Sequence, residues 1–219
     1  IQRIAAAINA TATTRDIGVI IDEWGAWHTE AVSETGLEQP GTVIDALSAA
    51  AVLDIFNHNA DVMTMGNIAQ TVNVLQCLVE TEGEDAWARP TYHVFDLYSP
   101  HQGNDAIQTT VEAPVRDAER TDDDLPLVGA SASVGDDETY VTLTNLDVRG
   151  AHEVEIDVQG ADPDAVDAQI LFDGQEPDAV VDADNAASFE PDAFDVGVGS
   201  DGTLTAELPP STVLGVSLR

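Results

Sequence analysis

Residues 17–21, Ile-Gly-Val-Ile-Ile, form an apolar run that stops abruptly at two carboxylates, Asp22 and Glu23. A short run rich in β-branched residues predicts a strand that is buried on both faces, as in a parallel sheet. In a (β/α)₈ barrel, side chains that follow the C-terminal end of such a strand lie at the mouth, where the catalytic residues of barrel enzymes are found. The run therefore favours a barrel strand that delivers a carboxylate to a site.

Two indoles, Trp24 and Trp27, accompany these carboxylates. An indole face can stack on a sugar ring, so the segment suggests glycoside hydrolysis, a reaction that needs two carboxylates. The alternative is that Asp22 and Glu23 merely begin a solvated loop of a very acidic protein. We expect Trp24 to pack in the core and not to serve as a sugar platform, because most buried aromatic side chains stabilise cores.

The next 50 residues alternate between the two types of periodicity. Residues 42–58 place apolar side chains at a spacing near 3.6, which predicts a helix that packs one face. Residues 60–65 are typical of a short strand, and residues 67–74 are interpreted as the start of a further helix. Strand, helix, strand and helix in this order indicate a βα repeat.

Four segments occur in an order that is known from one family of enzymes. They are Asp22-Glu23-Trp24-x-x-Trp27, residues 58–61, residues 65–74 and residues 91–95. In order and content they resemble the C-terminal half of the α-L-arabinofuranosidases of glycoside hydrolase family 51. The resemblance is dense from about residue 18 to about residue 103 and weak in the remainder.

This resemblance implies a fold of class α/β plus all-β. Residues 1–104 are expected to be the C-terminal part of a (β/α)₈ TIM barrel, with strands 7 and 8 and their helices. Residues 105–219 are expected to form a C-terminal antiparallel β-sandwich. Periodicity in the second part also predicts strands, at residues 106–112, 127–134, 139–146, 152–158, 168–172, 203–208 and 213–218.

The resemblance also implies an activity, the retaining hydrolysis of terminal arabinofuranosyl groups of hemicellulose or arabinan. Glu23 matches the catalytic nucleophile of the family, and Trp27 and Gln70 match residues that line the sugar site. Gln70 has a second interpretation, as an amide at a helix start that satisfies nearby backbone groups. Asp22 is either a hydrogen-bond partner behind the site or an ordinary carboxylate at a strand end.

The second carboxylate that the family needs is not found. Its general acid/base is a Glu that follows an Asn, and no Asn-Glu pair occurs in the 219 residues. Residues 1–8 resemble the end of the helix before the seventh strand. We therefore expect the sequence to be a portion of a longer enzyme and to be inactive alone, with the remainder of the barrel or a homo-oligomer covering its apolar face. The alternative is a non-catalytic, truncated module for carbohydrate binding or assembly.

Composition indicates a salt-adapted surface. The chain has 41 acidic and 7 basic residues, a formal net charge of -34, and no Lys at all. Dense carboxylates repel one another at low ionic strength and are screened at high salt, so we expect a halophilic protein. Disorder is the competing explanation, but 43% hydrophobic residues and clear periodicities favour a folded chain. The charge excludes nucleic acid and anionic membranes as partners and is compatible with a neutral arabinose-containing oligosaccharide or polysaccharide.

The remaining candidates favour ordinary structural roles. Cys77 lies in the apolar stretch 72–79, expected to be helical, and is interpreted as a small buried side chain. His28 follows Trp27 directly and either borders the sugar pocket or, as we expect, lies in a surface loop. The five histidines show no paired ligand spacing, so we predict no metal site and no cofactor. Trp87 is placed on the loop and helix region after the eighth strand, either at the rim of the site or as an anchor of that loop.

Two acidic runs, residues 121–124 and 182–185, lack the spacing of a calcium loop and are interpreted as solvated turns. No apolar stretch reaches the 18 residues of a membrane span and no signal peptide is visible, so we expect a cytoplasmic location.

Overall fold

The computed structural model of the chain describes residues 1–11, 14–116, 124–160 and 165–219. Its first part contains α1 (Gln2–Asn9), β1 (Val19–Trp24), η1 (Ser33–Thr35), α2 (Val43–His58), β2 (Met63–Ile68), β3 (Val79–Glu82), β4 (Asp85–Ala88), α3 (Pro90–Tyr98) and η2 (Ser99–His101). Its second part contains β5 (Asp105–Ile107), β6 (Val115–Arg116), β7 (Leu125–Pro126), β8 (Val128–Val134), β9 (Thr139–Asn145), β10 (His152–Ile156), β11 (Val166–Leu171), η3 (Ala186–Phe189), β12 (Asp192–Ala193), β13 (Gly197–Val198), β14 (Leu204–Leu208) and β15 (Val213–Leu218).

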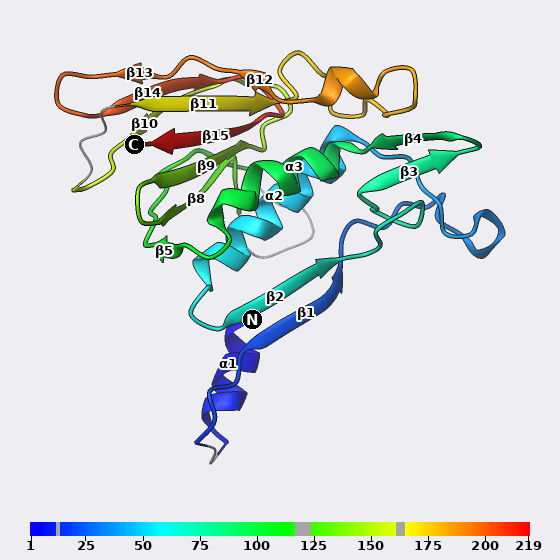
Figure 1. Ribbon diagram of the computed structural model, residues 1–219, viewed down its shortest axis with the longest axis horizontal. Helices are drawn as coiled ribbons and strands as arrows, with labels where there is room; N and C mark the ends of the chain where they lie inside the picture. Colours follow the sequence, from blue (N-terminus) through cyan, green and yellow to red (C-terminus); the bar gives the residue numbers. More distant parts are fainter. Residues whose placement is uncertain (12–13, 117–123, 161–164) are drawn as a thin grey trace.

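The β1 and β2 strands pair in parallel and are joined by the α2 helix, as the βα repeat predicts (Figure 1). The α2 helix begins at a capping box, in which the Thr42 hydroxyl accepts from the Asp45 amide and the Asp45 carboxylate accepts from the Thr42 amide. This reciprocal pair satisfies two backbone donors that a helix start otherwise leaves free. The capping box therefore fixes where α2 begins.

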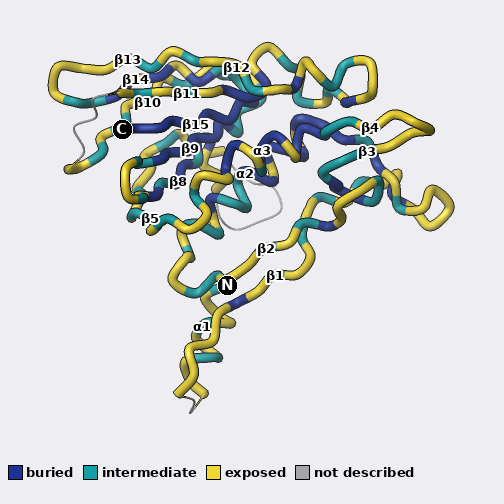
Figure 2. Tube along the Cα trace, viewed as in Figure 1, coloured by how far each residue is buried: buried dark blue, intermediate teal, exposed yellow. Residues whose placement is uncertain are grey.

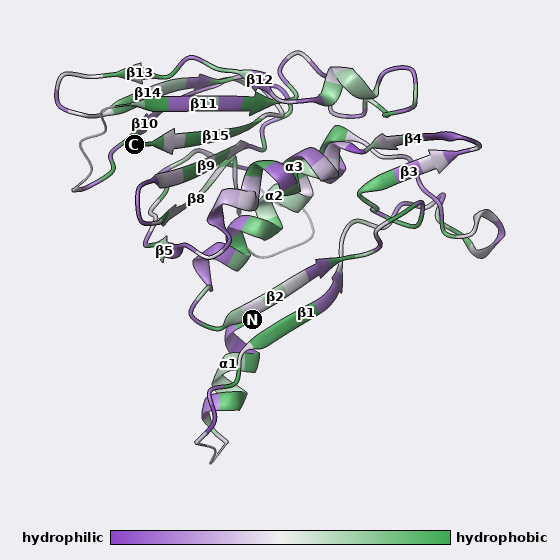
Figure 3. Cartoon of the chain, viewed as in Figure 1, coloured by the Kyte–Doolittle hydropathy of each residue, from purple (hydrophilic) through white to green (hydrophobic). Residues whose placement is uncertain are grey.

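Burial of β1 on both faces was expected, and this part of the prediction is wrong for the chain as described. Val19 is buried, but the side chain of Ile20 is 52% exposed. Among the described residues, β2 is the strand paired with β1, and the apolar run is largely open to solvent (Figures 2 and 3). The β-branched residues are typical of a strand that is buried on both faces, but within the described residues the second face of β1 is not covered.

The helix predicted over residues 67–74 is not formed. Residues 67 and 68 complete β2, and the chain then runs irregularly to β3. Asn73 and Leu75 have φ angles of 61° and 54°, which an α-helix does not allow. Their amides donate to the carbonyls of Val79 and Leu37, so distant partners replace the helical hydrogen bonds. Cys77, expected on this helix, lies in the irregular segment, and it is buried as predicted.

The second part of the chain is an antiparallel β-sandwich. One sheet has the strand order β12-β11-β15-β9-β8-β5 and the other the order β10-β14-β13. Apolar side chains from both sheets form the core between them, including Val141, Leu214 and Leu208. Each of the seven strands predicted from periodicity overlaps a strand of the structure, which confirms the sandwich. The domain boundary between residues 104 and 105 stays a prediction.

The α2 and α3 helices lie between the six-stranded sheet and the β1–β2 pair (Figure 1). Alternation along β8 and β9 points the hydroxyls of Ser131, Ser133, Thr142 and Thr144 toward these helices, where all four are buried. The polar face of the sheet is therefore not solvated. It meets Asp54, a buried carboxylate of α2 that accepts hydrogen bonds from the hydroxyls of Ser131 and Tyr98.

Candidate active site

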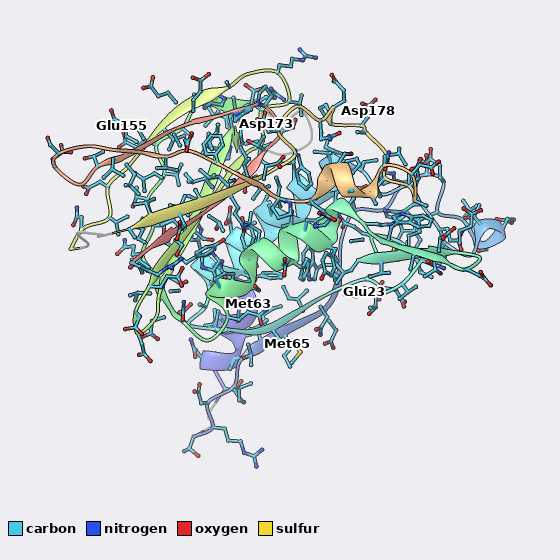
Figure 4. All side chains as sticks on the ribbon, turned by 45° about the horizontal axis from the view of Figure 1, so that its top comes forward. Glu23, Met63, Met65, Glu155, Asp173 and Asp178 are labelled. Carbon is cyan, nitrogen blue, oxygen red and sulfur yellow. The ribbon has the colours of Figure 1, made fainter. Side chains whose placement is uncertain are left out.

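A hollow of about 170 Å³ opens where the β1 strand ends. It is lined by Glu23, Trp24, Gly25, Ala26, Trp27, Ala69 and Leu75. The structure therefore brings together Glu23 and Trp27, two of the three predicted site residues. Glu23 lies toward the end of the β1–β2 pair nearest the β3–β4 hairpin, whereas Met63 and Met65 belong to the opposite part of β2 (Figure 4).

Gln70 is not part of the lining. Its neighbour Ala69 is, and the Ala69–Gln70 peptide bond, just past the end of β2, is cis. The Gln70 side chain is exposed beside the rim. No helix begins at this position, so the interpretation of Gln70 as an amide at a helix start is wrong. A sugar contact by Gln70 stays a prediction.

The two adjacent carboxylates of β1 have different surroundings. Successive side chains of a strand point to opposite faces, which separates Asp22 from Glu23. The Asp22 carboxylate accepts a hydrogen bond of 3.3 Å from the Asn67 side chain on β2. Glu23 is exposed and lines the hollow. Among the described residues, no basic side chain lines the hollow, so a ligand there would meet the Glu23 carboxylate, the two indoles, apolar side chains and backbone groups.

The two indoles also differ. Trp24 is half-buried and packs with its ring centroid 5.4 Å from that of Phe56 and 5.9 Å from that of Phe95, but it also lines the hollow, so its role as a packing residue and not a sugar platform stays a prediction. Trp27 is 62% exposed, and its Nε1 donates to the Ala31 carbonyl at 3.0 Å. The hydrogen bond holds the edge of the indole, which leaves ring surface available to a ligand.

Two buried glutamines, which the sequence did not single out, hold the segment that carries Trp27. The Gln76 side chain accepts from the Ala26 amide at 2.7 Å. The Gln39 side chain donates to the Ala26 carbonyl at 3.2 Å and accepts from the His28 amide at 3.1 Å. Amides are common in loops, so composition and periodicity carry no signal for this role.

His28 lies in the loop after β1, as expected, and its side chain is 22% exposed, but it is held by a buried carboxylate. Its Nε2 lies 2.7 Å from Asp45 Oδ1, and the Asp45 side chain is 2% exposed. Asp45 thus caps the α2 helix and also contacts the loop after β1. The signal in the sequence was the capping box, since it fixes where the Asp45 carboxylate lies.

Other candidates have structural roles in the described residues. Trp87 lies on β4, not on a loop or helix, and packs against the core cluster of α2 and α3, which favours its interpretation as an anchor. The Asp182 carboxylate accepts from the amides of Asp184 and Asn185, as in a solvated turn. The run at residues 121–124 falls mainly outside the described residues. Within the described residues, no group of three metal-ligating side chains was found.

A carboxylate at the end of a parallel βαβ strand, beside an exposed indole at an open hollow, is an arrangement typical of barrel glycoside hydrolases. The attached β-sandwich further restricts the class of glycoside hydrolase to which the chain can belong. Residues 22–211 match the family model described as the alpha-L-arabinofuranosidase C-terminal domain. The chain belongs to this family.

Relatives and solved structures agree with this assignment. The chain is 30% identical to an intracellular exo-alpha-L-arabinofuranosidase of Bacteroides ovatus over 94% of its own length and 40% of the relative. It is 26% identical to an intracellular exo-alpha-(1->5)-L-arabinofuranosidase of Streptomyces lividans over 90% of its length and 31% of that protein. The crystal structure of the GH51 arabinofuranosidase from Xanthomonas axonopodis pv. citri superposes with a TM-score of 0.90 at 30% identity, over all of this chain and 44% of that one.

The chain therefore spans about two fifths of the length of the first of these relatives. Its fold is that of the C-terminal βα units and β-sandwich of this enzyme family. Across the described residues, every helix is too short or too polar to traverse a lipid bilayer.

Proposed function

We propose that this chain is the C-terminal portion of a retaining α-L-arabinofuranosidase and that Glu23 supplies the nucleophile. One observation carries the proposal: Glu23 and Trp27 line the same hollow at the carboxyl end of β1. Membership of the arabinofuranosidase family makes a terminal arabinofuranosyl group of hemicellulose or arabinan the expected substrate. Such a group is neutral, which suits a chain with a formal net charge of -34.

In the proposed reaction, the Glu23 carboxylate attacks the anomeric carbon, and the bond to the leaving group breaks as an arabinosyl ester forms on Glu23. Water then hydrolyses this ester, so the configuration is retained overall. A second carboxyl group must protonate the leaving oxygen and later activate the water. We propose that the remainder of the barrel supplies this group and covers the exposed face of β1, and that the chain alone is inactive.

The named relatives from Bacteroides ovatus and Streptomyces lividans are described as intracellular. On that basis we propose a cytoplasmic location for this protein as well. Assembly into a homo-oligomer stays a prediction.

The test uses the protein produced from the complete reading frame that contains this chain, with an aryl α-L-arabinofuranoside as substrate. A good leaving group needs little protonation, so the rate reports mainly the nucleophile. Glu23→Ala should lower kcat by about 10³-fold or more, and added azide should restore turnover by attacking in place of the carboxylate. The matched control is Asp22→Asn, which changes the neighbouring exposed carboxylate and should leave kcat within about threefold.

Retained turnover in Glu23→Ala would refute the assignment of the nucleophile. If the wild-type protein fails to hydrolyse arabinofuranosides but still binds them, the non-catalytic carbohydrate-binding module becomes the better description.

A further inference from the structure

We propose that Gln76 and Gln39 are positioning residues that set where the Trp27 indole stands relative to Glu23, and so how the sugar is held. This inference rests on the proposed function, because it assigns a purpose to the hollow. The glutamines touch neither the anomeric carbon nor the reacting carboxylate. They act through the backbone on either side of Trp27.

The backbone around Trp27 is held at three points by buried side chains. The Ala26 amide donates to Gln76, the Ala26 carbonyl accepts from Gln39, and the His28 amide donates to Gln39. Gln76 is 2% and Gln39 is 4% exposed, so water does not compete for these groups. Trp27 itself is 62% exposed, so its position depends on these neighbours and on its hydrogen bond to the Ala31 carbonyl.

The two glutamines are themselves fixed. The Gln76 side chain donates to the Asp45 carbonyl at 2.6 Å, which ties it to the first turn of α2. Arg89 is 1% exposed and donates to the carbonyl of Leu75, the residue before Gln76, and to the carbonyl of Gln39. One guanidinium therefore holds the backbone of both glutamine segments. Its Nε also pairs with Glu80 at 2.8 Å, so the arginine charge is compensated.

The geometry of the segment that carries Trp27 explains why such support is needed. Glu23 is on a strand, whereas Trp27 lies in the irregular segment that begins at Gly25, whose φ of 141° is accessible mainly to glycine. A Cβ at residue 25 would lie 2.5 Å from the Gln76 Oε1, so the backbone at Gly25 packs directly on the glutamine. The strand fixes the nucleophile, and the two glutamines fix the indole.

Losing the hydrogen bonds from Gln76 or Gln39 to residues 26 and 28 should weaken substrate binding more than it slows the chemical step. If Trp27 is correctly placed for only a fraction of the time, the apparent dissociation constant rises by the inverse of that fraction. Molecules that have bound substrate in the correct geometry still react at the normal rate. We therefore expect KM to rise while kcat at saturation is preserved.

The experiment measures amide hydrogen exchange and steady-state kinetics in the protein from the complete reading frame. The variants are Gln76→Ala and Gln39→Ala. The matched control is Gln175→Ala, which removes another glutamine that donates to a backbone carbonyl, that of Ser188, far along the chain in the sandwich region. Exchange should accelerate about tenfold at the Ala26 amide in Gln76→Ala and at the His28 amide in Gln39→Ala, the effect of losing one buried hydrogen bond in each case. KM should rise by a similar factor, with kcat within about twofold, and the control should match the wild type.

Unchanged exchange at Ala26 and His28 in both variants would overturn the proposal, as would a fall in kcat with KM unchanged. Exchange that rises evenly across the α2 helix and the sandwich, with no excess at residues 25–28 in either variant, would also overturn it, because the glutamines would then serve only general stability. The azide experiment on Glu23 tests the proposed function separately. Amide exchange tests whether Gln76 and Gln39 hold the backbone around Trp27, whether or not an arabinofuranoside is the substrate.

Discussion

Replacing Asp54 with asparagine should make the stability of the protein less dependent on pH. Asp54 lies on α2 against the hydroxyl-bearing face of the sandwich sheet and is 4% exposed. Its Oδ1 accepts hydrogen bonds from Tyr98 at 2.9 Å and Ser131 at 2.8 Å, while its Oδ2 is buried without a partner in the described residues. Burial disfavours the charged carboxylate more than these hydroxyls favour it, so the pKa of Asp54 rises from 3.8 to about 6.

The size of the effect follows from the shift. A rise of about 2 pKa units at 1.36 kcal/mol per unit corresponds to about 3 kcal/mol. The folded chain holds the proton more tightly than the unfolded chain, so the stabilisation from proton binding is complete below pH 3.8. It is lost as the pH rises to about 6. Above that pH, folding carries the full cost of burying an ionised Asp54, and asparagine avoids this cost.

Urea unfolding from pH 4 to pH 7.5 at high salt tests this, because urea leaves the ionic strength unchanged. The difference in unfolding free energy between Asp54→Asn and the wild type should grow by about 2.4 kcal/mol across this range and level off above about pH 6.5. Other carboxylates cancel in the difference. The hydrogen bond from Ser131 lowers the pKa of Asp54, so Ser131→Ala should raise that pKa. The pH at which the protein loses the stabilisation from proton binding should then be higher than in the wild type. A flat difference curve for Asp54→Asn would refute the reasoning.

Three further outcomes are expected. The net charge of -34 should make the unfolding free energy rise by a few kcal/mol as KCl shortens the Debye length from about 10 to about 3 Å, and a stability independent of salt would contradict the halophilic interpretation. Gly66→Ala should lower stability by about 1–3 kcal/mol, because its Cβ would collide with the Phe56 ring, and an unchanged thermal midpoint would contradict the packing of α2 on β2. Trp27→Ala should leave stability within about 0.5 kcal/mol, since the side chain is 62% exposed, but should weaken arabinofuranoside binding about tenfold; equal affinity in titration calorimetry would exclude Trp27 from the site.

The parts of the fold that could be predicted are those where local chemistry and tertiary packing agree. The capping box of Thr42 and Asp45 and the apolar spacing after it both indicate α2. The strands of the sandwich alternate because one face meets the second sheet. Alternation alone cannot say what covers the other face, and the hydroxyls of Ser131 and Thr142 turned out to meet a buried carboxylate and not water.

The irregular segment after β2 could not be predicted, because its backbone partners are distant in sequence. The Leu75 amide donates to Leu37, and the Ala69 amide donates to Trp24. A run of small and apolar residues looks helical when such partners are unknown. The same limit applies to the site. Glu23 and Trp27 are only four residues apart, so one motif in the sequence contains both. Gln39, Gln76 and Arg89 come from three segments that only the fold brings together.

The most direct test of the central claim is to trap the glycosyl-enzyme in the protein from the complete reading frame. A 2-fluoro-arabinofuranoside with a good leaving group should form the ester and hydrolyse slowly, because fluorine destabilises the positively charged transition states of both steps. Peptide mass spectrometry with fragmentation between Asp22 and Glu23 then locates the label. We expect a fluoroarabinosyl group on Glu23. A label on any other residue, or rapid inactivation of Glu23→Gln by the same reagent, would contradict the assignment of Glu23 as nucleophile.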